Sequence, residues 1–237
     1  MTTISWLDLS WCLIPVVLVC IIYFYWQGKP QEVLMASARM VIQLVAVGYV
    51  LVSIFDNPSP WVSLMIVSVM MVVAAWIAIR PVRHQTGFLM PALMALTISV
   101  TFHMFITLAL VLKAPSWYQP ELLIPIAGMF FANTMNSISL AAERYQAEVN
   151  NHIDIESARL NAFHAAMIPQ INGLLAVGLV ALPGMMTGQI LSGVSPLVAV
   201  RYQIMIMTMI LGATGLGAAI MLWLISRKQL SNTKKAT

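Results

Sequence analysis

The chain has 237 residues, of which 60% are hydrophobic and 8% are charged, and its mean hydropathy is +0.88. Soluble domains carry about 25% charged residues, so this composition excludes a water-soluble globule. Two cysteines also cannot hold a chain of this length as a secreted disulfide scaffold. The net charge of +4 is typical of the basic cytoplasmic loops of membrane proteins and does not indicate nucleic-acid binding.

Apolar segments of membrane-spanning length recur along the whole chain. Crossing a bilayer as a helix takes about 20 predominantly apolar residues. In chain order, the predicted spans cover about residues 6–26, 33–55, 61–79, 87–112, 122–140, 171–191 and 203–225. The first is too long for a cleavable signal peptide and has no basic residues before it. We therefore predict an all-α, polytopic membrane helix bundle of about seven transmembrane helices, forming a single domain over residues 1–237.

The distribution of Lys and Arg predicts the orientation of these spans. With the N-terminus outside, only Lys113 and Arg201 lie on the outer side, and the other ten of the twelve basic residues lie on the cytoplasmic side. Cytoplasmic loops of membrane proteins carry an excess of basic residues. We therefore expect a multi-pass protein with its N-terminus outside and its C-terminus in the cytoplasm.

One loop differs from the others because it is long and acidic. Residues 141–166 contain four of the eight acidic residues of the chain, Glu143, Glu148, Asp154 and Glu156. Apolar residues recur there near one helical face, so we predict an amphipathic cytoplasmic helix with Asp154 as its N-cap. It could lie at the lipid interface or form a docking surface for a cytoplasmic partner. Interfacial helices are usually basic, so the four acidic residues favour docking of a protein.

Polar side chains within the spans are candidates for a substrate path, because such groups are costly in lipid. Arg39 and Gln43 lie one turn apart in the second span, and Asn133 and Asn136 share a helical face in the fifth. Each pair also has a structural explanation. Arg39 can extend to the interface, and Asn pairs can hold helices together.

Two of the spans contain Pro and Gly in their interiors. Pro125 and Gly128 lie in the fifth span, and Pro183 and Gly184 lie in the sixth. These residues predict helix breaks, which in transporters mark the binding site. Gly184 and Gly188 also match a helix-packing motif, which is the structural alternative.

Methionines lie beside these predicted breaks. Met129 and Met135 flank Asn133, and Met185 and Met186 follow Gly184. Thioether sulfur is a soft metal ligand suited to Cu(I), although methionine is also a flexible filler of apolar cores.

Several motifs for other functions are missing from the sequence. It has no G-x-x-x-x-G-K-[ST] for binding ATP, and no H-E-x-x-H or G-x-S-x-G of the common hydrolases. Its last span has no lysine for a retinal Schiff base, and its carboxylates lie near the predicted span ends or in the acidic loop. A transporter of this composition is more easily driven by a separate ATPase, docked on the acidic loop.

Several short blocks, spread in order over most of the chain, resemble the FetB-like permeases, the iron-export subunits of two-component ABC transporters. The blocks are Ala38-Arg39, Gln43-Leu44 and Gly48-Tyr49; Ile124-Pro125-Ile126-Ala127-Gly128-Met129 with Asn133 and Met135; Leu182-Pro183-Gly184-Met185-Met186-Thr187-Gly188; and Tyr202-Gln203-Ile204-Met205. The resemblance implies a homodimer in the cell inner membrane that pairs with two ATPase subunits and exports iron, a related metal or a metal complex. The family carries a Leu-Gly-Ala-like turn in its cytoplasmic loop, whereas no glycine lies between Gly128 and Gly173 here.

We therefore expect a permease domain that is not itself an enzyme and holds no cofactor, with ATP bound on the partner subunit. The predicted substrate path consists of Arg39, Gln43, Met129, Asn133, Met135, Asn136, Met185 and Met186. The alternatives are a membrane-embedded enzyme or receptor without an ATPase, and an ABC permease for a non-metal solute.

Overall fold

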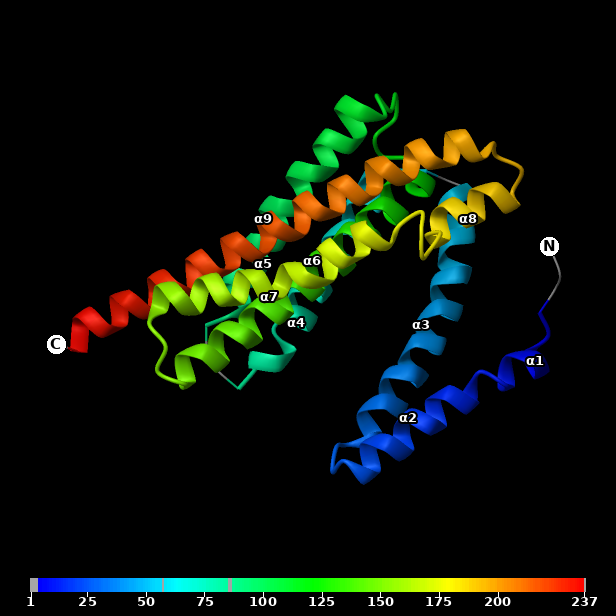
Figure 1. Cartoon of the computed structure of the whole chain (residues 1–237). Helices are drawn as coiled ribbons and strands as arrows, with labels where there is room; N and C mark the ends of the chain where they lie inside the picture. The colour runs from blue at the N-terminus through cyan, green and yellow to red at the C-terminus, as the bar shows by residue number, and fades with distance from the viewer. Residues whose placement is uncertain (1–3, 57, 85–86, 237) are drawn as a thin grey trace. The chain divides into compact units, whose positions relative to one another are not determined.

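The computed structural model describes residues 4–56, 58–84 and 87–236, with side chains up to Gln229, and their regular secondary structure is helical (Figure 1). Its elements are α1 (Trp6–Ser10), α2 (Leu13–Tyr25), α3 (Pro30–Asp56), α4 (Pro60–Ala78), the 3₁₀ turn η1 (Arg80–Val82), α5 (Leu89–Phe105), the π-helix η2 (Ile106–Val111), α6 (Pro120–Asn150), α7 (Ile155–Ala176), α8 (Gly184–Leu191) and α9 (Pro196–Ala236). The only β-type pairing in these ranges is an isolated bridge between Val177 and Ala181. This confirms the predicted all-α fold.

Six helical segments in the described ranges are long and apolar enough to cross a membrane. They are Trp6–Tyr25, Pro30–Asp56, Pro60–Ala78, Leu89–Val111, Pro120–Asn150 and Pro196–Gln229. They confirm a polytopic membrane bundle and match six of the predicted spans. The remaining predicted span, residues 171–191, is wrong as one helix, because α7 ends at Ala176 and α8 begins only at Gly184.

The chain divides into two compact units, Met1–Asn57 and Pro58–Thr237. In the first unit, α2 packs against α3 in a helical hairpin. The turn between them places Gln27 at a φ of 57°. Gly28 follows, and a β-carbon there would lie 2.9 Å from the ring of Tyr23. The prediction of one domain over residues 1–237 stays a prediction.

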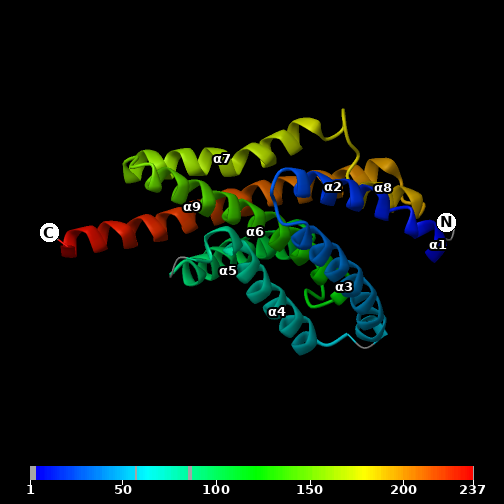
Figure 2. The same cartoon turned by 90° about the horizontal axis from the view of Figure 1, so that it is seen from below.

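The second unit is built around α6 and α9, which lie side by side in the same direction (Figures 1 and 2). The hydroxyl of Ser137 lies 3.4 Å from the carbonyl oxygen of Thr214, and nearer the C-terminal ends the hydroxyl of Tyr145 donates to Oε1 of Gln229 at 2.9 Å. Between α6 and α9 in sequence, α7 runs back alongside both of them (Figure 2). Because α6 and α9 are candidate spans with the same direction, residues 151–195 have to return the chain between them. The helix α7 makes this return, although it is not itself among the apolar candidate spans.

Small and polar residues fill the seam between α5, α6 and α9. The hydroxyl of Ser99 donates to the carbonyl oxygen of Ala213 at 2.5 Å, and the Nδ1 of His103 lies 2.8 Å from the carbonyl oxygen of Ser99. Buried polar groups need such partners. Large apolar side chains, including Phe130, Leu96 and Met221, complete the core of this unit.

The predicted cytoplasmic loop over residues 141–166 is wrong as a separate element. The helix α6 continues to Asn150 and α7 begins at Ile155, so the link between the two helices is only four residues long. The predicted apolar face of the amphipathic helix, Ile153, Leu160, Phe163 and Met167, is buried only in part, since Phe163 packs against the core. The fully buried side chains of α7 are Ala158, Ala162 and Ala166, whereas Leu160 is 54% exposed. Alanines spaced four residues apart let α7 approach its neighbours closely, and polar residues between them, such as Arg159 and Asn161, hide this pattern in the sequence.

Candidate functional site

The second unit contains a helix interruption that lines a cavity. The helix α7 ends at Ala176, and the backbone then turns at Gly178, whose φ is +84°. Glycine adopts this conformation without steric cost. Pro183, which lacks a backbone N–H, is the N-cap of α8 with an extended backbone. The non-helical stretch therefore covers residues 177–183, and Pro183 and Gly184 stand at its end.

A cavity of about 270 Å³ lies beside this interruption. It is bounded by the end of α7, the linker, α8 and the start of α9, which meet in Figure 1. Its lining includes Leu174, Leu182, Met186, Gln203, Met207 and Thr208. Among the described residues that line the cavity, none carries a charge. The site is therefore suited to holding a solute through its apolar surface and a few polar atoms.

Gln203 is the polar side chain that distinguishes this cavity. It is only 5% exposed, and within the described part of the chain its Oε1 has no hydrogen-bond partner. In contrast, the hydroxyl of Thr208 donates to the carbonyl oxygen of Ile204 at 2.8 Å. A buried, unpaired amide oxygen is unfavourable by about 1–3 kcal/mol, so Gln203 destabilises the packing beside the cavity.

Gln203 is a site residue that the sequence pattern did not indicate. It is the first residue of the predicted last span, where a polar residue is typical of a membrane boundary. The helix α9 begins at Pro196, so Gln203 lies about two turns inside it. The Pro at position 196, which favours a helix start, was the available signal.

Of the predicted path residues, Met186 lines the cavity. Its neighbour Met185 packs against the hydrophobic core instead, as do Met129 and Met135 on α6. The helix α6 therefore does not contribute its two predicted methionines to this cavity.

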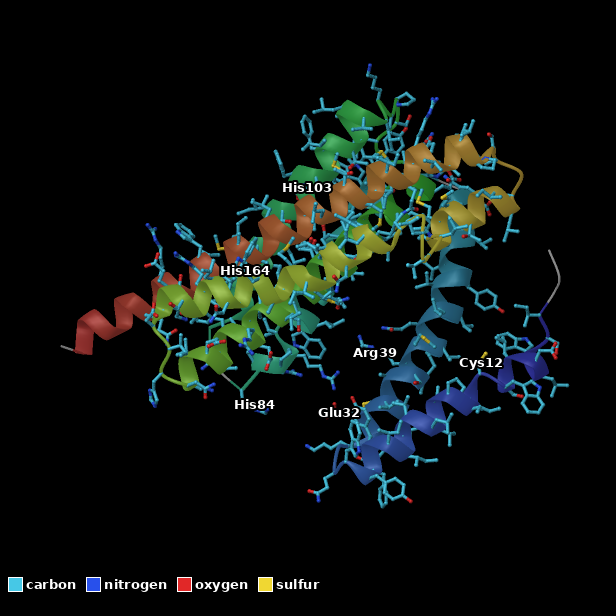
Figure 3. All side chains as sticks on the ribbon, in the orientation of Figure 1. Cys12, Glu32, Arg39, His84, His103 and His164 are labelled. Carbon is cyan, nitrogen blue, oxygen red and sulfur yellow. The ribbon has the colours of Figure 1, made fainter. Side chains whose placement is uncertain are left out.

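The two asparagines of α6 also lie elsewhere. The Nδ2 of Asn133 donates to the backbone oxygen of Met129 at 2.8 Å within the same helix, and Asn136 is exposed. Arg39 and Gln43 are exposed on α3 in the first unit, where Figure 3 labels Arg39.

The predicted helix break at Pro125 and Gly128 is wrong, because α6 runs without interruption through both residues. Pro125 is the sixth residue of the helix, and its missing N–H removes one hydrogen bond, to the carbonyl of Glu121. Gly128 serves close packing, since a β-carbon there would lie 3.4 Å from the terminal methyl of Met70 on α4.

Within the ranges that the structure describes, no group of three or more His, Cys, Asp or Glu side chains is placed to hold a metal ion. The labelled histidines in Figure 3, His84, His103 and His164, belong to different parts of the second unit.

The acidic residues that were predicted to dock a partner have different environments. Glu148 is 7% exposed and forms an ion pair with Arg144 at 2.5 Å, so its prediction as a docking side chain is wrong. Glu143 is exposed on α6. Asp154 is exposed and caps α7, accepting from the backbone N–H of Glu156 at 3.1 Å. Hydrogen bonds from the side chain and backbone of Ser157, followed by that of Glu156, hold the pKa of Asp154 below its ordinary value.

A groove of about 370 Å³ lies between α7 and α9 at this end of the unit. Glu156 and Arg159 line it, with their charged groups 3.9 Å apart. Trp223 forms part of the opposite wall and carries the guanidinium of Arg227 over its ring at 4.2 Å. The groove thus combines charge with apolar surface, as docking surfaces for proteins do.

A model of the uncharacterised protein family UPF0014 matches residues 6–230 of the chain. The UPF0014 membrane protein slr1647 of Synechocystis sp. is 36% identical, over 88% of this chain and 87% of the relative. The Probable iron export permease protein FetB of Escherichia coli is 32% identical, over 84% of this chain and 81% of the relative. The UPF0014 membrane protein YjkA of Bacillus subtilis is 31% identical, over 82% of each chain. No solved structure matches the chain. These relatives confirm the resemblance found in the sequence.

Proposed function

Because this chain belongs to the UPF0014 family of membrane proteins, we propose that it is the permease subunit of an ABC-type exporter. Its cargo is iron or a related metal leaving the cytoplasm, and a separate ATPase subunit supplies the energy. The name of the Escherichia coli relative, an iron export permease, supports the cargo and the direction. The absence of a P-loop motif from the sequence supports a separate ATPase.

The interrupted segment from α7 to α8, with the cavity beside it, carries this proposal. Interrupted helices line the binding sites of many transporters, because backbone freed from a helix needs cover from protein or access to a cavity. Met186 and Gln203 face this space from two elements. A change in the angle between α7 and α8 would open or close the cavity.

We place the ATPase at the turn between α6 and α7. The exposed Glu143 and the groove containing Glu156 are charged and lie near the C-terminal part of α9. This end faces the cytoplasm when the N-terminus is outside, in agreement with the basic residues around it. Two copies of the permease with two ATPase subunits complete the transporter.

Metal accumulation in cells tests the cargo. Cells lacking the gene should retain more iron than cells complemented with the wild-type chain, and a panel of other metals measured in parallel identifies the preferred ion. Equal accumulation of every metal in both strains, with the protein present in the membrane, would contradict metal export.

Co-purification tests the ATPase. The solubilised wild-type protein should retain an ATPase subunit after mild crosslinking, and Glu143→Lys with Glu156→Lys should weaken that retention. Glu32→Lys, at the start of α3 in the other unit, is the matched control for the change in charge. An ATPase that is never retained, or that binds the double variant as well as the wild type, would contradict docking at this surface.

A further inference from the structure

Two exposed basic side chains from distant parts of the sequence lie at the end of the second unit where α4 leads into η1. Arg83 follows η1 directly, next to His84, which Figure 3 labels. Lys228 comes from α9, and its Nζ lies so close to Gly87 that a β-carbon there would clash with it. Because Gly87 is only four residues after Arg83, α9 brings Lys228 to the segment that carries Arg83.

No carboxylate in the described part of the chain neutralises these two cations. Residues 57–120 and 157–237, which include α4, η1, α5 and α9, contain no Asp or Glu. On α6, which packs against η1, one carboxylate is already paired with an arginine of the same helix. The other, Glu143, is exposed and forms no ion pair with either cation. An anion that neutralises this end therefore comes from outside the described chain.

The length of α4 places Arg83 at the level of the lipid headgroups. The helix has 19 residues and is therefore about 28 Å long, close to the roughly 30 Å of a hydrocarbon core. Trp61 and Trp76 lie near its two ends, and tryptophan is enriched at both membrane interfaces. Arg83 follows the second tryptophan and so lies beyond the hydrocarbon.

The guanidinium of Arg83 is held in place by Trp76. Its central carbon lies 4.4 Å from the centre of the ring, and Trp76 is itself 43% exposed. An arginine stacked on an aromatic ring keeps N–H groups free at its edge, and these match two oxygens of a phosphate. Arg83 is therefore oriented to bind a phosphate at the surface of the bilayer.

An exposed apolar face of α4 leads from Trp76 toward the middle of the helix. Met65, Val69 and Val72 are exposed and share this face with Trp76, because they recur at spacings of three and four residues. In a bilayer such a face contacts acyl chains. The two cations and this face are therefore arranged in the same order as the headgroup and the chains of a phospholipid.

We propose that Arg83 and Lys228 bind the phosphate of an anionic phospholipid, whose acyl chains lie along the exposed face of α4. Cations without a neighbouring carboxylate attract a headgroup with a net negative charge, whereas they repel the amine of a zwitterionic headgroup. The inference requires only that the chain spans a membrane, and it goes beyond the proposed function because it depends neither on the cargo nor on the ATPase.

Native mass spectrometry of the full-length protein in detergent tests this binding. The probes are phosphatidylglycerol, which is anionic, and phosphatidylcholine, which is zwitterionic, with identical acyl chains. The wild type should bind phosphatidylglycerol at least about fivefold more tightly, since one basic residue near an anionic headgroup is worth roughly this factor. Arg83→Gln and Lys228→Gln should each weaken binding of phosphatidylglycerol about fivefold and change that of phosphatidylcholine much less.

Two further variants separate a specific site from a general effect of charge. Arg201→Gln removes one exposed positive charge near the other end of α9 and should leave the preference for phosphatidylglycerol unchanged. Trp76→Leu keeps an apolar side chain on the face of α4 but releases the guanidinium of Arg83. It should therefore weaken binding of phosphatidylglycerol more in the wild type than in Arg83→Gln.

Equal binding of the two lipids by the wild type would overturn the proposal, as would a loss in Arg201→Gln that equals the loss in Arg83→Gln. Inorganic phosphate that displaces phosphatidylglycerol better than chloride does at equal ionic strength would also overturn it, by assigning the cations to a free anion. Val72→Cys with Cys12→Ser and Cys20→Ser, in liposomes, tests for a second copy on this face. It should form few disulfides between copies, and efficient crosslinking would show that protein and not lipid covers α4.

Discussion

Gly217 on α9 lies so close to Thr134 on α6 that a β-carbon built on Gly217 would be 2.5 Å from the methyl carbon of Thr134. The contact is made between backbone and side chain at the centre of the pair of parallel helices. Glycine is therefore required here for the distance between the helices and not for an unusual backbone conformation.

Gly217→Ala should destabilise the protein by about 1–3 kcal/mol, because the added methyl group has to displace buried Thr134. The melting temperature in detergent, followed by tryptophan fluorescence, measures the change. Gly173→Ala on α7 is the control, since nothing lies within 4 Å of its β-carbon position. There the greater helix propensity of alanine should stabilise by up to about 1 kcal/mol. Equal effects at the two positions would contradict the close approach of α6 and α9.

Met185 and Met186 are adjacent in sequence and should respond differently to truncation. Met185→Ala removes a side chain that packs against the core and should lower stability by about 2 kcal/mol. Met186→Ala enlarges the cavity and should lower stability by less than about 1 kcal/mol while changing transport. Thermal unfolding and metal accumulation in cells measure the two effects. A loss of stability confined to Met186→Ala would contradict the orientation of α8.

The cap of α7 should depend on pH through Asp154. Its pKa is lower in the folded protein because Ser157 and Glu156 donate hydrogen bonds to the carboxylate. A depressed folded pKa means that the stabilisation is complete above the ordinary pKa of about 4 and is lost as the pH falls through the lower folded value. Hydrogen exchange of the amides at 156–158, corrected for intrinsic rates, should therefore become less protected in that range.

Asp154→Asn should keep the cap and remove its dependence on pH, since asparagine is also a favourable N-cap but does not titrate. Asp154→Ala should reduce protection at every pH. Protection that declines with acid equally in the wild type and in Asp154→Asn would assign the effect to another group.

The side chains of Tyr145 and Gln229 connect the C-terminal parts of α6 and α9. Tyr145 is 1% exposed, and its hydroxyl donates to the Oε1 of Gln229 at 2.9 Å. Tyr145→Phe should cost about 1 kcal/mol in stability, because it removes the donor and keeps the ring. Tyr49→Phe is the control, as Tyr49 is 79% exposed, and should change stability by less than about 0.5 kcal/mol. Indistinguishable melting temperatures for the two variants would contradict this contact.

The spans with continuous apolar character could be predicted from the sequence, because their length and composition alone decide that they are membrane helices. The helix α7, which returns the chain between α6 and α9, could not be predicted in this way. In α7 the residues that pack are Ala158, Ala162 and Ala166, which carry little hydrophobic signal and are surrounded by polar residues. The alanine face of α7 is buried because α6 and α9 pack against it.

The same distinction applies to the candidate site. Pro183 and Gly184 indicated an interruption that lies where α8 begins, whereas Pro125 indicated one where α6 is continuous. Pro125 removes one hydrogen bond from a helix that continues, whereas Pro183 begins α8 after the chain has turned at Gly178 in a left-handed conformation. Pro196 places Gln203 inside the last helix, but the lack of a partner for its Oε1 is a property of the packed structure and could not be predicted from the sequence.

The unbroken course of α6 has a mechanical consequence. A helix of 31 residues is about 46 Å long, and α6 continues through its one internal proline, Pro125, without a break. A displacement of Asn150 would therefore move the whole of α6, whereas the chain between α7 and α8 can bend at residues 177–183, which are not helical. A tilt of α6 would thus be absorbed beside Gln203, in the longest non-helical stretch of the described chain between α6 and α9.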